Sequence, residues 1–291
     1  MRLVKQALYI FFALLPLLVY ADSLVDAQGN PSPALRQLFY VLENIDPQIP
    51  LSFAELTAIA EEKWLQTGKE RWEFEHRYRD KAQYAIYPIR ALELTEEKKA
   101  QKLQYDYAIV LGATTSTMKN RLAFLVEEYL RGVRFKKLIF LTGQRQLTNF
   151  ESTVEGIETE AQMMRYLFQK IDCDPLKTVP MRFINAPNKL TEDGKIERPS
   201  RRDTIQIWLE SSPKPGSCLF ISNMPFCRYE HAALRNLMPK GFTIETIGPK
   251  AREDLRFEVQ IDNIARWMKL EKAYLDTQRS NQSAAGVDMA M

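Results

Sequence analysis

The stretch Tyr105-Asp-Tyr-Ala-Ile-Val-Leu-Gly112 constrains the fold of this chain more than any other. It is a mainly apolar and aromatic run that ends at a glycine, and the polar sequence Thr114-Thr-Ser-Thr117 follows it. Apolar residues at helical spacing come next, between Lys119 and Gly132. The pattern predicts a buried strand, a tight polar turn and an amphipathic helix. A strand buried on both faces needs helices over both faces, which is typical of a parallel α/β sheet.

The same alternation continues along the chain. Strands are expected at residues 105–112, 137–142, 179–184, 217–222 and 242–247, and helices between them at 119–132, 159–171, 201–210 and 225–238. A long polar loop is expected at residues 185–198. Strands that alternate with helices indicate an α/β fold with a doubly wound, mainly parallel five-stranded sheet and right-handed crossovers.

The first residues have the pattern of a targeting segment. Arg2 and Lys5 precede a continuous apolar run that ends in Val19-Tyr-Ala21, which fits a cleavage site. The run is short for a membrane span, which needs about 20 residues, so residues 1–21 are interpreted as a cleaved signal peptide. The alternative is an uncleaved anchor in the inner membrane, and only then would the protein contact a membrane. Both interpretations place the folded part outside the cytoplasm, and an exported, periplasmic protein is the prediction.

Residues 32–104 are expected to form a helical segment and a connector before an α/β domain of residues 105–276. Pro33 opens the first helix, and Ser52 and Glu55 form a capping box for the second. A third helix is expected from Lys69 to the residue before Pro88. An apolar stripe predicts a final helix at 257–275, and residues 277–291 have no apolar period and are expected to be disordered.

Composition excludes several classes of function. Lys and Arg number 40 against 37 Asp and Glu, so no strong basic field points to nucleic acid. The three cysteines have spacings that resemble no metal motif, and no metal site is expected. The two histidines, His76 and His231, form no Ser-His-Asp or Cys-His constellation. The cofactor is unknown, because no motif of the sequence indicates one.

Glycines and hydroxyl residues stand where the expected strands end. Gly112, Thr114 and Thr115 follow the first strand, Gly143 ends the second, and Ser222 ends the fourth. Because the carboxyl ends of parallel strands meet at one edge, we expect these residues to form the floor of a ligand site. Backbone N–H groups and hydroxyls at a helix N-terminus suit an anion or the hydroxyls of a sugar. The alternative is that Gly112 is only a turn glycine.

Charged residues open the neighbouring helices. Arg202 and Arg228 are expected to supply positive charge to the site, with Thr204 close by. Glu160 and Asp203 are the only candidates here for acid–base catalysis. Each has a simpler explanation, because a helix dipole favours a carboxylate in the first turn and Asp is an ordinary N-cap residue. Whether the protein is an enzyme is therefore left open.

A set of short segments follows in a characteristic order: Tyr107-Ala-Ile-Val-Leu-Gly112, Arg121, Leu138-Ile-Phe-Leu-Thr-Gly143, Thr159-Glu-Ala161 with Met164, Arg202-Asp-Thr204, and Ile221-Ser222 with Arg228. In this order residues 105–247 resemble the YdcF-like and SanA-like bacterial domain family of unknown function. The resemblance implies a Rossmann-like domain, often exported or membrane-anchored, with a function in the cell envelope. The chain departs from the family pattern at Gln144, Gln206, Ile207 and Pro225, where the family has glycine, glutamate, asparagine and often histidine. Loss of an acid and a histidine weakens an acid–base interpretation.

These observations predict an exported protein of cell-envelope biogenesis or maintenance. It would bind, or act on, a small anionic ligand or envelope precursor at the carboxyl-terminal edge of the sheet. The alternative is a non-catalytic periplasmic interaction or scaffold protein that uses residues 32–87 as a surface for a protein partner. A cleft joining Thr115, Glu160, Arg202 and Arg228 would favour the first, and a filled cleft the second.

Overall fold

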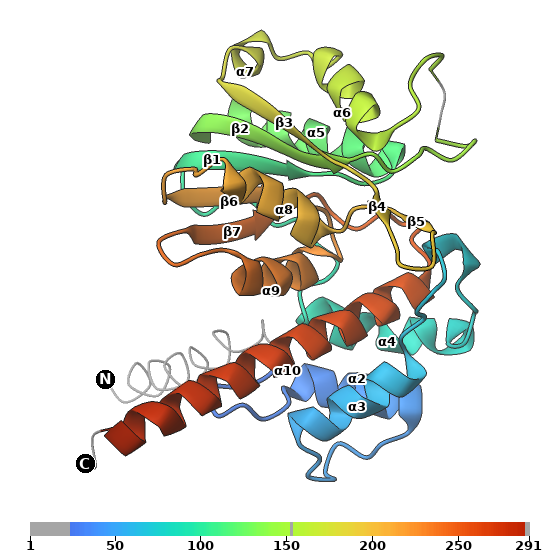
Figure 1. Ribbon diagram of the computed structural model, residues 1–291. Helices are drawn as coiled ribbons and strands as arrows, with labels where there is room; N and C mark the ends of the chain where they lie inside the picture. The colour runs from blue at the N-terminus through green and yellow to red at the C-terminus, as the bar shows by residue number, and fades with distance from the viewer. Residues whose placement is uncertain (1–23, 152–153, 289–291) are drawn as a thin grey trace, which may run out of the picture. The chain divides into compact units, whose positions relative to one another are not determined.

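The computed structural model describes residues 24–151 and 154–288, which form two compact units (Figure 1). One unit is Glu97–Ala251, and the other joins the described residues before it, 24–96, to those after it, 252–288. This division differs from the expected α/β domain of residues 105–276, because the last helix belongs to the N-terminal unit. The expected signal peptide, residues 1–21, lies outside the described residues.

The unit Glu97–Ala251 is built on one parallel sheet, as expected. Its strands are β1 (Gln104–Leu111), β2 (Arg134–Gly143), β3 (Met181–Ala186), β6 (Ser217–Ile221) and β7 (Thr243–Ile247). They pair in the order β3-β2-β1-β6-β7, and every pairing is parallel. Each strand lies close to its expected position, because a short apolar run between polar segments has to be buried.

Helices cover both faces of this sheet. They are α5 (Thr115–Leu130), α6 (Glu160–Gln169), the short α7 (Asp174–Lys177), α8 (Arg201–Glu210) and α9 (Cys227–Leu237). Successive residues of β1 alternate between the two layers. Ala108 and Val110 lie in the core cluster that includes residues of α5 and α6, whereas Ile109 and Leu111 lie in the cluster with α8 and α9. The doubly wound Rossmann-like fold is thereby confirmed (Figure 1).

The strand order reverses between β1 and β6. From β1 the chain continues outward through β2 and β3, and it then crosses to β6 and β7 on the other side of β1. In open sheets of this kind, ligands bind outside the carboxyl ends of the strands at such a switch point. Gly112, which follows β1, and Ser222, which follows β6, stand at this point.

The polar loop expected at residues 185–198 contains a small hairpin. β4 (Lys189–Leu190) pairs antiparallel with β5 (Ile196–Glu197). Gly194 lies between them with a φ of +78°, which glycine adopts without steric cost. No burial pattern marks these strands, because Leu190 and Ile196 are both exposed. The hairpin was therefore not readable from hydrophobic periodicity.

The second unit is helical within its described residues. Its helices are α2 (Pro33–Glu43), α3 (Phe53–Lys63), α4 (Ala82–Ala91) and α10 (Phe257–Asp288), with short 3-10 turns η1 (Arg71–Glu73) and η2 (Arg79–Lys81). Pro33 and the capping box of Ser52 and Glu55 start α2 and α3 as predicted. The apolar faces meet in a core where the ring of Phe39 stacks on Trp64, with centroids 4.3 Å apart.

The prediction of one continuous third helix at residues 69–87 is wrong. Its residues form η1, η2 and most of α4, and α4 continues past Pro88. Between residues 69 and 81 only Phe74 is a buried apolar residue, while Trp72 is exposed, so no continuous stripe holds a helix there. Pro88 is tolerated because the buried Ile89 holds the end of α4 in the core.

The last helix, α10, packs against α3. Its stripe residues Ile261, Ile264 and Met268 are buried, as the periodicity predicted. The helix runs to Asp288, whereas residues 277–291 were expected to be disordered, and residues 289–291 lie outside the described residues. Extending an existing helix costs little per residue, which explains the continuation without an apolar stripe. Among the helices of the described residues, none has the length and apolar sequence needed to span a bilayer.

Candidate functional site

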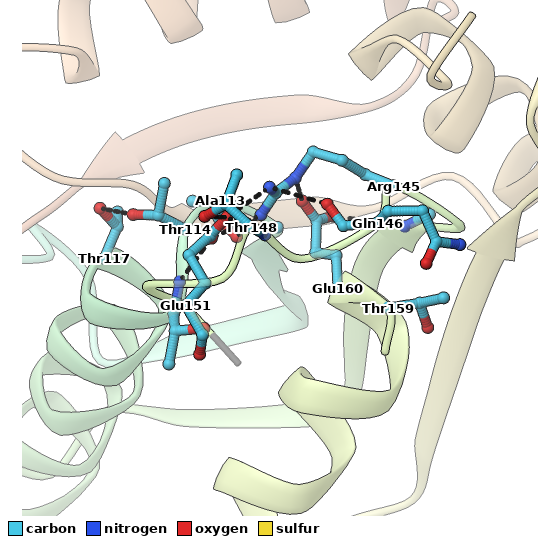
Figure 2. Close-up of polar contacts among 12 residues, drawn as sticks. Ala113, Thr114, Thr117, Arg145, Gln146, Thr148, Glu151, Thr159 and Glu160 are labelled. Carbon is cyan, nitrogen blue, oxygen red and sulfur yellow. Dashed lines mark hydrogen bonds and ion pairs between the residues drawn. The ribbon is translucent and has the colours of Figure 1, made fainter. Parts of the chain in front are cut away.

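Glu160 lies at the carboxyl-terminal edge of the sheet, as predicted. It is the first residue of α6, whose N-cap Thr159 forms a capping box with Gln162. The Glu160 side chain is only 12% exposed. Its Oε1 accepts a hydrogen bond from the N–H of Gly143 at 3.3 Å. Its Oε2 accepts a hydrogen bond from Nε of Arg145 at 3.1 Å (Figure 2). Because Thr159 caps the helix, the carboxylate of Glu160 is left to contact the strand ends.

The strand-end glycines make room for other parts of the chain. A Cβ atom on Gly112 would lie 2.1 Å from Oε1 of Glu160 and 2.9 Å from the carbonyl oxygen of Leu141. A Cβ atom on Gly143 would lie 2.3 Å from Cγ of Pro199. Gly112 is therefore more than a turn glycine. We expected both glycines to face a ligand, but the side chain of Glu160 lies against Gly112 and that of Pro199 lies against Gly143.

Arg145 joins Glu160 to a second carboxylate, that of Glu151 (Figure 2). Its Nη1 and Nη2 donate to the two carboxylate oxygens of Glu151, each at 2.9 Å, and Nη2 also donates to the carbonyl oxygen of Ala113. Bidentate pairs of this kind are among the strongest hydrogen-bonded contacts in proteins. The sequence pattern marks neither residue. The available signal for Arg145 is its position two residues after Gly143, at a strand end.

Glu151 occupies part of the N-terminus of α5. Its Oε1 accepts the N–H of Thr115 at 3.2 Å, and its Oε2 accepts the N–H and Oγ1 of Thr148. Thr115, a predicted ligand residue, is thus engaged by a carboxylate of the same chain. Thr114 is the N-cap but makes no capping hydrogen bond, and its hydroxyl donates to Oγ1 of Thr117 at 3.0 Å.

Two carboxylates share the charge of Arg145. Burial alone would raise the pKa of Glu151, but hydrogen bonds from Arg145 and Thr148 outweigh it and lower this pKa to about 2. Burial raises the pKa of Glu160 above its usual range, against the opposing charges of Arg145 and Arg121. Glu160 is therefore the member of the pair that takes up a proton first. A carboxyl group that holds a proton more readily than usual is suited to acid–base chemistry.

Arg121 fills part of the switch point. This buried residue of α5 donates through Nη1 to the carbonyl oxygens of Leu111 and Gly112, at 2.8 and 2.9 Å. Its Nε and Nη2 donate to Oδ1 of Asn223, at 3.1 and 2.7 Å. Arg121 thus ties the end of β1 to the residue after Ser222. The family resemblance included Arg121, but Arg121 was not among the residues that we expected to form the site.

Asp203 caps α8. Its Oδ2 accepts the N–H and Oγ of Ser200, at 2.7 and 2.8 Å, and its Oδ1 pairs with Nζ of Lys189. Of the two residues that we considered as the N-cap, Ser200 takes that position, and Asp203 supports it from the first turn. Thr204 is buried, and its Oγ1 donates to the carbonyl oxygen of Arg201. Both residues therefore stabilise the start of α8.

The expected cations, Arg202 and Arg228, lie in the first turns of α8 and α9. Arg202 is exposed, whereas its neighbour Arg201 pairs with the buried Glu230 of α9. Arg228 lies in the first turn of α9, where its positive charge acts on His231 of the same helix. Burial, with the charges of Lys98, Arg235 and Arg228, lowers the pKa of His231 to about 4. The cations that act most strongly on Glu160 are Arg145 and Arg121, rather than Arg202 or Arg228.

Ser222 is fully buried at the end of β6. Its N–H donates to the carbonyl oxygen of Ile247 at 2.8 Å, while its Oγ has no hydrogen-bond partner among the described residues. A buried hydroxyl without a partner costs about 1–3 kcal/mol. Ser222 thus adds a polar position to the switch point.

The described residues contain no group of three or more His, Cys, Asp or Glu side chains placed to hold a metal ion. Comparison with protein-family models, with curated proteins and with solved structures found no match. The fold and this geometry define the class: a Rossmann-like α/β protein with a buried acid–arginine–acid cluster, Glu151, Arg145 and Glu160, at the carboxyl-terminal edge of its sheet.

Proposed function

We propose that this protein is exported and periplasmic and serves in biogenesis or maintenance of the cell envelope. It binds or acts on a small anionic ligand or envelope precursor at the carboxyl-terminal edge of the sheet. The observation that carries the proposal is the N-terminus of α5, which lies at the switch point and whose N-cap residue, Thr114, makes no capping hydrogen bond. Such a helix end favours negative charge. The apolar N-terminal pattern and the family resemblance support the envelope location.

The groups around the start of α5 suit an anion. Ala113 and Thr114 are partly exposed, and the hydroxyls of Thr114, Ser116 and Thr117 lie within one turn. Glu151 already takes the N–H of Thr115. The anionic group of a ligand would therefore meet the hydroxyls of this turn.

Binding is tested by titrating nucleotides, sugar phosphates and cell-wall precursors into the full chain. A ligand that binds only the folded state should raise the melting temperature. Thr117→Val should weaken the affinity about fivefold to tenfold, since one hydrogen bond contributes about 1 kcal/mol. The control is Thr178→Val, because Thr178 follows α7 just before β3. This variant should bind the ligand with the affinity of wild type. Equal affinities for the two variants would argue against this site.

Catalysis depends on Glu160. With Asp203 in a helix cap, Glu160 is the remaining candidate for acid–base chemistry. If the protein is an enzyme, Glu160→Gln should reduce turnover about 10²- to 10⁴-fold and keep ligand binding. Glu155→Gln, at an exposed position before α6, should leave turnover unchanged. Turnover that survives in Glu160→Gln would exclude this carboxylate as the catalytic group.

A non-catalytic interaction role is the second candidate, because α4 has large exposed apolar side chains. Tyr84, Ile86 and Tyr87 are 62%, 44% and 78% exposed. They lie in the segment that we expected to offer a surface to a protein partner. If this alternative holds, none of the nucleotides, sugar phosphates and cell-wall precursors should raise the melting temperature of wild type or of Glu160→Gln.

A further inference from the structure

An open pocket of about 280 Å³ lies beside the edge strand β3, apart from the cluster around Glu160. It is lined by Arg165, Phe168 and Gln169 of α6, Lys177 of α7, and Met181 and Phe183 of β3. These residues of α6 belong to its C-terminal half, whereas Glu160 begins the helix. At 1.5 Å per residue, Gln169 lies about 13 Å along the helix from Glu160. The pocket is therefore a separate place on the same unit.

The floor of the pocket is aromatic and held by the core. The ring of Phe183 stacks on Phe140 with centroids 4.2 Å apart, and Phe140 meets Phe168 at 4.9 Å. Met181 is 37% exposed beside them. Methionine adapts its shape to irregular apolar partners. A flat apolar group can thus pack against the rigid aromatic rings on one side and against the adaptable side chain of Met181 on the other.

The rim of the pocket is cationic, and none of its six lining residues is acidic. The guanidinium of Arg165 lies 4.2 Å from the centroid of the Phe183 ring. Arginine carries five N–H donors, so its guanidinium can lie on a ring and still donate to an acceptor. Lys177 pairs at 3.3 Å with Asp174, which is 93% exposed, and such a pair is weak in water.

We propose that this pocket binds a small amphipathic anion, an aromatic carboxylate of one or two fused rings. Its ring packs on Phe168, Met181 and Phe183, and its carboxylate is held by Arg165 and Lys177. The C-terminus of α6 at Gln169 opposes an anion with only about half an elementary charge, which two full positive charges outweigh. The pocket volume lies just below the roughly 300 Å³ at which pockets for drug-sized ligands begin, so it suits a ligand of only one or two rings. This site is independent of the function proposed above.

The probe is 2-naphthoate, titrated into the full chain by calorimetry, with 2-naphthylmethanol as its neutral counterpart. Wild type should bind the carboxylate at least tenfold more tightly than the alcohol. Arg165→Gln should lose at least tenfold of the naphthoate affinity. Arg182→Gln is the matched control, because Arg182 is exposed on the same strand but alternation places it on the opposite face from Phe183. It should bind within twofold of wild type.

Three outcomes would overturn the assignment. One is no binding of naphthoate at millimolar concentration, and another is equal binding of the acid and the alcohol. The third is an affinity that falls in Thr117→Val and not in Arg165→Gln, which would place the probe at the start of α5 instead. Arg165 is exposed, so its variant should melt like wild type. Met181→Glu, which puts a like charge beside the carboxylate, is a second variant and should also lose at least tenfold of the naphthoate affinity.

Discussion

Replacing Arg145 with methionine should lower the free energy of unfolding by about 3 to 5 kcal/mol at pH 7, the usual cost of leaving a buried charge without its partner. Arg145 is 14% exposed, and it pairs with the buried carboxylates of Glu151 and Glu160. Methionine keeps much of the side-chain volume but none of the charge. Urea unfolding followed by circular dichroism measures the loss. Arg182→Met, at an exposed position, should change stability little.

The loss should shrink at low pH. The pKa of Glu151 is about 2 in the folded protein, well below its ordinary value of about 4.3. A depressed carboxyl pKa stabilises the fold above the unfolded pKa, and the contribution, about 3 kcal/mol here, disappears as pH falls from about 5 toward 2. The difference between wild type and Arg145→Met should therefore narrow between pH 5 and pH 3. An equal difference at pH 7 and pH 3 would mean that Arg145 acts through packing alone.

Gly112→Ala should cost about 3 kcal/mol, near the upper end for overpacking a tight site. The new methyl group would overlap Oε1 of Glu160 at 2.1 Å and crowd the carbonyl oxygen of Leu141 at 2.9 Å. Removing the first obstacle with Glu160→Ala in the same chain should recover part of the loss, while the Leu141 carbonyl still resists. A double-mutant cycle measured by urea unfolding should show a coupling of about 1 kcal/mol or more. Simple additivity would show that Glu160 does not lie against Gly112. Lys119→Ala, at an exposed position of α5, is the control.

The unit Glu97–Ala251 could be largely predicted from local patterns. The strands β1, β2 and β6 are apolar runs long enough to need burial on both faces, and their alternation with helical stripes predicts a doubly wound sheet. Placing Glu160 at the sheet edge followed from the same topology. The start of α8 was also predictable in part, because Ser200 and Asp203 are both residue types that favour an N-cap, and Ser200 takes that position. These features depend on neighbours in the sequence, or on rules that hold for all parallel sheets.

Only the tertiary structure decided what surrounds Glu160. Arg145 and Glu151 stand in a polar loop without periodicity, so nothing local indicates that they pair with each other and with the start of α5. Arg201 makes the inward ion pair and Arg202 does not, because Arg201 lies on the side of α8 that meets Glu230 of α9. The stripe of α10 showed that the helix has an apolar face, but not that this face packs against α3. Hydrophobic pattern specifies that a surface is buried, while its partner is chosen by contacts between residues far apart in the chain.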